Sequence, residues 1–180
     1  MERRSSHMAR CTGRRLTGGM TESTQLLRVA VLIGATVSTG LMAGLFYAFA
    51  VAVMPGLGRA GDRTFVEAMQ RINVAILNGW FAAAFAGAAL LTAAAGLLHL
   101  GRPELPWIAA AFVAYGAALV VTFRMNIPLN DALDAAGEPG RIPDLAAVRG
   151  RFEAAWVRWN VVRALVCTAA LALLSWALAV

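Results

Sequence analysis

The sequence predicts an all-α integral membrane protein, a four-helix bundle with short connections and one longer polar loop between helices 3 and 4. Apolar residues make up 59% of the 180 residues and charged residues only 14%, whereas a soluble domain carries roughly 25% charged residues. The chain also contains long uncharged stretches, each about as long as a helix that crosses a bilayer. Lipid is therefore expected to surround much of the outer surface.

The first 25 residues are polar, rich in arginine and without hydrophobic periodicity. We interpret residues 1–25 as a disordered extension or as the result of a mis-called start codon, because Met20 offers a second start. A cleaved signal peptide is disfavoured, since the apolar run that follows is too long for a signal sequence. The role of residues 1–19 stays open.

The transmembrane domain is predicted over residues 26–180. The first span ends at Pro55, because proline cannot continue a helix, and an amphipathic stretch from about Asp62 leads directly into the second span. A tight turn around Gly101 separates the second and third spans, and residues 124–144 form the longest polar connection. The predicted spans cover about residues 27–53, 74–98, 107–123 and 161–179.

Four spans place both termini and the 99–106 turn on one side of the membrane. If the chain starts at Met20, the terminus side carries two arginines and the opposite side carries nine. The positive-inside rule then places both termini outside. Keeping the first nineteen residues adds five arginines, which makes seven against nine and leaves the orientation open.

The ionisable residues exclude several classes of function. All ten acidic residues fall outside the four spans and the chain contains no lysine, so a proton or ion pathway lacks charged groups at membrane depth. The two histidines, His7 and His99, and the two cysteines, Cys11 and Cys167, cannot assemble a haem, metal or disulfide redox site. We expect no cofactor and no metal ion. The arginines lie between apolar blocks, which indicates contact with lipid headgroups and not with nucleic acid.

Polar side chains cluster where three helices enter the membrane, all on the same side by the order of the spans. The last helix presents one face with the spacing i, i+3, i+4 and i+7. The clustered residues are Trp156, Trp159, Asn160 and Arg163, then Asn126, Asn130 and Asp131, and finally Gln70 and Asn73. Together these helix ends can line a pocket at the membrane interface.

A structural interpretation of the same residues stays open. Tryptophan and arginine at a membrane boundary are ordinary anchors, and Asn and Gln near helix ends often cap or bridge helices. We interpret Met54 and the aromatic residues Phe46, Tyr47 and Phe49 as core or lipid-facing residues.

Two segments in this order, Asn126-Ile-Pro-Leu-Asn130 and Trp156-Val-Arg-Trp159-Asn160-Val-Val-Arg163, resemble the DUF1772, or anthrone oxygenase-like, membrane proteins. The segments Gly40-Leu-Met-Ala-Gly44-Leu-Phe46 and Met69-Gln70-Arg71-Ile72-Asn73 are similar to the first half of that family. The resemblance covers about residues 26–180. It implies a four-helix membrane protein, and some fungal members of the family are linked to oxidation of anthrones to anthraquinones.

The resemblance favours a cofactor-independent oxygenase, an oxidoreductase that acts on a hydrophobic aromatic substrate such as an anthrone. Arg163, Asn160 and the indole N–H of Trp159 are candidate donors to an enolate oxygen. Asp131 is the candidate general base. The candidate substrate-binding residues are Gln70, Asn73, Asn126, Asn130 and Trp156.

Two other functions stay open. The same pocket suits a non-catalytic membrane protein that binds a lipid-like ligand or a partner membrane protein, and the polar cluster also suits a purely structural role. The expected partners are membrane lipid and a hydrophobic small molecule, without nucleic acid, and the oligomeric state stays open. We expect a multi-pass protein of the cell membrane, the inner membrane of a bacterium.

Overall fold

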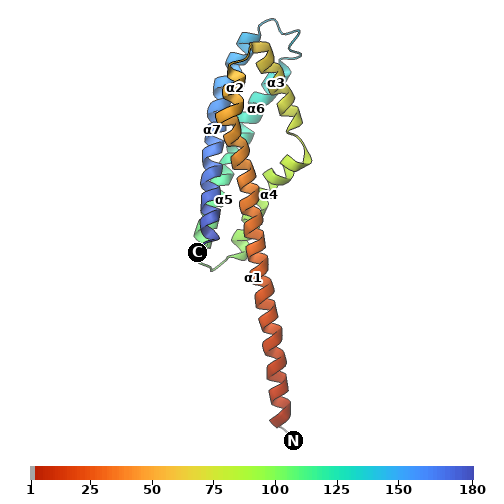
Figure 1. Cartoon of the computed structure of the whole chain (residues 1–180), viewed down its shortest axis with the longest axis vertical. Helices are drawn as coiled ribbons and strands as arrows, with labels where there is room; N and C mark the ends of the chain where they lie inside the picture. Colours follow the sequence, from red (N-terminus) through yellow and green to blue (C-terminus); the bar gives the residue numbers. More distant parts are fainter. Residues whose placement is uncertain (1–2) are drawn as a thin grey trace.

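The protein is described here from a computed structural model (Figure 1), which covers the backbone of residues 3–180 and the side chains of residues 22–180. Most side chains of residues 1–25 lie outside this range. The interpretation of that segment as a disordered extension or a mis-called start therefore stays a prediction. All regular elements in the described part are helical. They are α1 (Arg3–Ala48), the π-helical η1 (Phe49–Val53), α2 (Met54–Gly58), α3 (Asp62–Ala75), α4 (Gly79–Leu98), α5 (Leu105–Val121), the π-helical η2 (Thr122–Asn126), α6 (Ile127–Ala135) and α7 (Leu145–Ala177).

The predicted fold class is confirmed. Within the described residues, four helical segments are long and apolar enough to cross a membrane: Glu22–Gly58, Gly79–Leu98, Leu105–Ala135 and Leu145–Ala177. Their outer faces carry large apolar side chains, among them Leu41, Leu90 and Leu165, which are 61%, 69% and 66% exposed. Continuous apolar exposure of this kind suits lipid and not water. The chain is a multi-pass membrane protein.

The helices pack through small residues. α1 contacts α4 and α7, and α5 packs along α7. Alanines occupy many of the contact positions with 0–1% exposure, including Ala88, Ala95, Ala111, Ala118 and Ala170. Small side chains let helix backbones approach closely, and this approach supplies packing energy where lipid provides no hydrophobic drive. Figure 1 shows the C-terminus and the α4–α5 turn at one end of the bundle, and α2, α3 and α6 at the other end.

Two prolines lie inside helical segments and not at their ends. Pro55 stands in the first turn of α2 directly after η1, and Pro128 stands in the first turn of α6 directly after η2. Proline lacks an N–H and its ring crowds the preceding turn, so that the wider π-helical turn before it allows the helix to continue. The first span therefore reaches Gly58 and the third reaches Ala135. The connection to α7 shortens to residues 136–144 and is still the longest.

The amphipathic stretch and the second span form two separate helices. α3 ends at Ala75, and the side chain of Asn78 caps α4 by accepting hydrogen bonds from the backbone N–H groups of Trp80 and Phe81, at 3.0 and 3.1 Å. An Asn cap satisfies donors that a helix start otherwise leaves unpaired, so it fixes the start of α4. The resulting break at residues 76–78 lies inside the predicted second span.

Arg149 holds the corner made by α2, α3 and α7. Its guanidinium donates to the carboxylates of Glu153 and Asp62, at 2.6 and 3.0 Å. It also donates to the backbone carbonyls of Gly58 and Ala60, at 2.8 and 2.9 Å, and lies 4.6 Å from the centre of the Phe65 ring. These contacts close the ends of the short helices onto α7 above the candidate site.

The buried apolar residues form two clusters. The bundle cluster runs along α1, α4, α5 and α7 and includes Leu32, Met42, Ile108 and Leu174. The corner cluster joins η1, α2, α3, α6 and α7 through Phe49, Met54, Phe65, Val66, Met69, Leu133, Phe152 and Trp156. On α7, the buried polar residues Asn160 and Arg163 lie between Trp156 of the corner cluster and Ala164 of the bundle cluster. The polar site therefore interrupts the run of buried apolar residues along α7.

Candidate functional site

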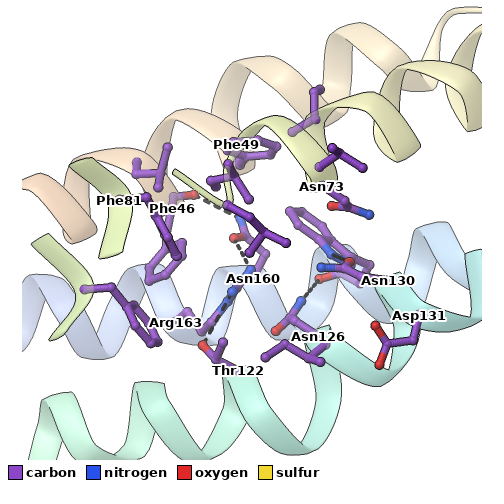
Figure 2. A pocket seen from close by; sticks show the side chains of 18 of the residues that line it. Phe46, Phe49, Asn73, Phe81, Thr122, Asn126, Asn130, Asp131, Asn160 and Arg163 are labelled. Carbon is purple, nitrogen blue, oxygen red and sulfur yellow. Dashed lines mark hydrogen bonds between the residues drawn. The ribbon is translucent and has the colours of Figure 1, made fainter. Parts of the chain in front are cut away.

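A cavity of about 410 Å³ lies at this interruption, with walls from α1, η1, α3, α4, η2, α6 and α7. Eight of the nine predicted site residues line it: Gln70, Asn73, Asn126, Asn130, Asp131, Trp156, Asn160 and Arg163. Figure 2 shows six of these side chains around one space: Asn73, Asn126, Asn130, Asp131, Asn160 and Arg163. The order of the spans predicted that these helix ends lie on the same side of the membrane. In the structure their side chains also line the same cavity.

Arg163 is a buried cation without an ion-pair partner in the described part of the chain. The residue is 6% exposed, and no carboxylate among residues 22–180 forms an ion pair with it. Its Nη1 donates to Thr122 Oγ1 at 3.5 Å, while Nε has no hydrogen-bond partner in the described part of the chain. Burying an unpaired charge is costly. This cost makes the cavity attractive to a ligand that carries negative charge.

Aromatic rings offset part of this cost. The guanidinium carbon lies 4.2 Å from the centre of the Phe46 ring and 5.5 Å from the centre of the Trp156 ring. A cation over an aromatic face is attracted by the ring's negative face, by up to about 2 kcal/mol when water is excluded. The rings thus hold Arg163 in place without neutralising it.

Asn160 fixes the position of the guanidinium. Its Oδ1 accepts a hydrogen bond of 3.0 Å from Arg163 Nη2, and its Nδ2 donates to the backbone carbonyl of Phe46 at 2.9 Å. The residue is 0% exposed, so both contacts form in a medium of low polarity, where they are stronger than in water. Asn160 therefore positions Arg163 and ties α7 to α1.

A second set of hydrogen bonds joins α7 to the segment from η2 to α6. Trp156 Nε1 donates to Asn130 Oδ1 at 2.8 Å, and Asn126 Nδ2 donates to the backbone carbonyl of Trp156 at 3.4 Å. Asn126 is 1% exposed, and its Oδ1 is without a partner among the described residues. This oxygen is a buried acceptor on a residue that lines the cavity.

The two predicted residues on α3 differ in their contacts. Gln70 Nε2 donates to the backbone carbonyls of Leu133 and Gly137, at 2.9 and 3.0 Å, and so attaches α3 to the end of α6. Asn73 Nδ2 is buried and has no partner within the described region. Gln70 is thus committed to the fold, whereas Asn73 keeps a free donor.

Trp159 does not line the cavity. Its ring lies 5.1 Å from the guanidinium carbon of Arg158. Each helical residue turns by about 100°, so that position 159 stands about 60° away from position 156 on the helix surface. Trp156, and not Trp159, turns its indole toward the polar side chains of the site.

Several aromatic residues of the cavity were not predicted from the sequence. Phe46 and Phe49, interpreted as core or lipid-facing, both line the cavity, as do Phe81, Phe85 and Phe123. Tyr47 faces outward and is 59% exposed, and Met54 is buried in the corner cluster. The periodicity of α1 marks Phe46 and Phe49 as inward-facing but does not indicate that the space in front of them is open.

Thr122 and Asp134 were also missed. Thr122, Asn126 and Asn130 follow one another at intervals of four residues, a spacing that places them on one helix face. The sequence prediction ended the third span at Phe123, before Arg124, and placed Pro128 in a polar connection, so this helix face was not recognised. Asp134 lines the same cavity from α6, three residues after Asp131.

The cavity is polarised along its length. In Figure 2, Arg163, Phe46 and Phe81 lie at one end, and Asn73, Asn130 and Asp131 lie at the other. A guanidinium among aromatic rings thus faces amides and a carboxylate across a space open to a small molecule. No three His, Cys, Asp or Glu side chains among residues 22–180 are grouped closely enough to hold a metal ion.

The fold and the site define a class: an integral membrane bundle of four helices with a polar, aromatic-lined pocket at one end of the helices. The family model for anthrone oxygenase matches residues 71–173. The chain belongs to the anthrone oxygenase family, and the resemblance predicted from the sequence is confirmed. No curated protein and no solved structure gives a significant match to the chain.

Proposed function

We propose that this protein is a cofactor-independent oxygenase that converts a hydrophobic, anthrone-like aromatic into the corresponding quinone. The observation that carries the proposal is the buried guanidinium of Arg163, which lies among aromatic rings without a carboxylate partner among the described residues. Family membership supports the choice of substrate class. The volume of about 410 Å³ falls in the usual range for small-molecule pockets, roughly 300–1,000 Å³.

The chemistry begins with loss of a proton from the methylene carbon that lies opposite the ketone of an anthrone. The product is an enolate whose negative charge rests largely on the former ketone oxygen. Arg163 is the donor for this oxygen, since its charge is held in place by Asn160 and Phe46 before any substrate binds. Donors that are already oriented in a dry site stabilise developing charge more than solvent does.

The remaining steps need dioxygen and no bound cofactor. The enolate gives one electron to dioxygen, and the resulting superoxide combines with the carbon radical to form a peroxide at the former methylene carbon. Protonation gives a hydroperoxide. Loss of the second proton from that carbon, with cleavage of the O–O bond, forms the new carbonyl and releases water. One anthrone and one dioxygen thus yield one anthraquinone and one water.

Asp131 is our candidate for the base that removes the first proton. It lines the cavity at the end opposite Arg163, so a planar substrate with its oxygen on Arg163 directs its far side toward the α6 carboxylates. A carboxylate positioned in this way contributes about 10²–10⁴-fold to a proton transfer. The amides of Asn130 and Asn73 lie at the same end and suit the polar substituents of such a substrate.

The test is oxidation of anthrone to anthraquinone by the protein in lipid nanodiscs, followed by absorbance and by dioxygen uptake. Arg163→Gln keeps a polar side chain but removes the charge, and we expect kcat/KM to fall by about 100-fold or more. Arg158→Gln is the matched control, because Arg158 is exposed on the same helix and does not line the cavity. We expect it to leave the rate unchanged.

Two results distinguish the alternatives. If anthrone is oxidised no faster than in empty nanodiscs, the proposed reaction is wrong. If the protein nevertheless binds an aromatic anion and Arg163→Gln abolishes that binding, the non-catalytic ligand-binding function is favoured. We propose the cell membrane as the site of action, which is supported by the four helical segments that are long and apolar enough to cross a bilayer.

A further inference from the structure

The cavity has an apolar opening on the outside of the bundle. Three of its lining residues are large, apolar and strongly exposed: Val74 is 67%, Leu77 80% and Phe123 58% exposed. Val74 lies in the last turn of α3, Leu77 lies in the break between α3 and α4, and Phe123 belongs to η2. The opening therefore lies between the α3–α4 junction and η2, and its edge is built from side chains that suit lipid.

The break between α3 and α4 creates this opening. Figure 1 shows the α3–α4 junction projecting from the side of the bundle. Further along α4 the gap closes, because Tyr115 of α5 donates a hydrogen bond of 2.9 Å to the backbone carbonyl of Phe85. The Phe85 and Phe123 rings also meet there, with 6.2 Å between their centres. The opening is thus bounded and lies beside the aromatic end of the cavity.

The depth of the opening follows from its neighbours. Trp80 precedes the cavity residue Phe81 and is 90% exposed. Arg124 follows Phe123 and is exposed, as is Arg158 between Trp156 and Asn160. Outward-facing Trp and Arg side chains lie at the boundary between headgroups and acyl chains. The opening therefore faces the membrane just inside this boundary.

We infer that the ligand enters the cavity sideways from the bilayer, through this opening, and not from bulk water. The class of ligand rests on the proposed function: a planar aromatic that dissolves in lipid and carries one oxygen that becomes negative. Its rings pass between Leu77 and Phe123, and its oxygen meets Arg163 inside. Asp131 and Asp134, both exposed, mark the alternative opening toward water.

The experiment measures exchange of a fluorescent probe, 9-anthracenecarboxylate, with the full chain in phosphatidylcholine nanodiscs by stopped-flow anisotropy. The double variant Leu77→Trp/Phe123→Trp narrows the lateral opening. We expect it to slow association and dissociation by about tenfold each and to leave the Kd nearly unchanged, as narrowing of an entrance does. Leu77→Ala/Phe123→Ala widens the same opening and should speed both rates, which guards against misfolding of the first variant.

Two further variants complete the design. Leu165→Trp adds the same bulk at a lipid-facing position, 66% exposed, that does not line the cavity, and it should exchange the probe at the parent's rate. Asp134→Trp narrows the opening toward water and should slow exchange less than the lateral double variant. Parental rates in both double variants, or slowing by Asp134→Trp that equals or exceeds that of the lateral variant, would overturn lateral entry.

Failure of the lateral entrance and failure of the proposed reaction are distinguishable. If the protein binds the probe but does not oxidise anthrone, the proposed reaction is wrong. The exchange rates of the probe still decide between the lateral opening and the opening toward water. A parent chain that does not bind the probe at all would overturn both the ligand class and the entrance.

Discussion

Arg163 donates a hydrogen bond of 3.0 Å to the side-chain oxygen of Asn160, three residues earlier on α7. The amide nitrogen of Asn160 is used at the same time on the backbone of α1. The guanidinium therefore has a fixed position before a ligand arrives, and its charge is shared with no carboxylate of the described chain. A rigid, uncompensated cation in a low-polarity cavity is the feature from which the functional conclusions follow.

Asn160→Leu tests this arrangement through stability. The substitution leaves Arg163 Nη2 and the Phe46 carbonyl without their partner, and we expect the free energy of unfolding to fall by roughly 1–3 kcal/mol. Unfolding in mixed micelles with increasing dodecyl sulfate measures the change. Val161→Leu, at the lipid-facing neighbour, is the control and should leave stability unchanged. Equal stability of Asn160→Leu and the parent would contradict the positioning role.

The assignment of the base is tested by a pair of matched substitutions. Asp131→Asn keeps the shape of the side chain and removes its ability to accept a proton, so we expect kcat on anthrone to fall by about 10²–10⁴. Asp134→Asn is the same change three residues later, and we expect less than about a tenfold effect. Stopped-flow absorbance under saturating dioxygen measures both. A larger effect at position 134 would transfer the role of base to Asp134.

Arg149 is expected to contribute more to stability than any surface ion pair. Arg149→Gln leaves two carboxylates and two backbone carbonyls of the α2–α3 corner without their donor, which costs roughly 2–4 kcal/mol. Arg141 pairs with Glu138 at 3.3 Å, but the two side chains are 86% and 69% exposed. We expect Arg141→Gln to change stability by less than about 0.5 kcal/mol. Thermal unfolding in detergent compares the two variants, and an equal loss in both would be contrary to this ranking.

Gly137 carries a positive φ of 89° where α6 turns into the connection to α7. A Cβ is disfavoured at such an angle, so Gly137→Ala should destabilise the protein by about 1 kcal/mol. Gly150 lies inside α7, where an added Cβ meets no atom within 4 Å. Gly150→Ala should therefore stabilise the helix by up to about 1 kcal/mol. Opposite signs in the same unfolding assay are the expected result, and equal signs would refute the argument from backbone angle.

The number of membrane-spanning helices and most of the polar site could be predicted from the sequence. Uncharged runs of bilayer length leave the backbone no other way to satisfy its hydrogen bonds than to form helices. The spacing of Trp156, Asn160 and Arg163 marks one face of one helix, and the order of the spans brings it to the same side as Asn126 and Asn73. These inferences need only helix geometry and a membrane.

The remaining features depend on tertiary structure that no local pattern reports. Pro55 indicated a helix end and Pro128 was placed in a polar connection, but a π-helical turn before each proline lets the helix continue. Periodicity places Phe46 on an inner face without showing that a cavity lies in front of it. The sequence did not indicate that Asn78 caps the start of a new helix. The aromatic walls of the cavity and its lateral opening follow from these three features, and therefore could not be predicted.

The hydrogen bond between Asn160 and the carbonyl of Phe46 joins residues that are 114 positions apart in the chain. During synthesis, the first helix enters the membrane long before the ribosome has made the last. The polar cavity therefore does not form in any nascent chain that stops short of α7. It is completed only when the final helix inserts and places the Arg163 guanidinium against the Phe46 ring.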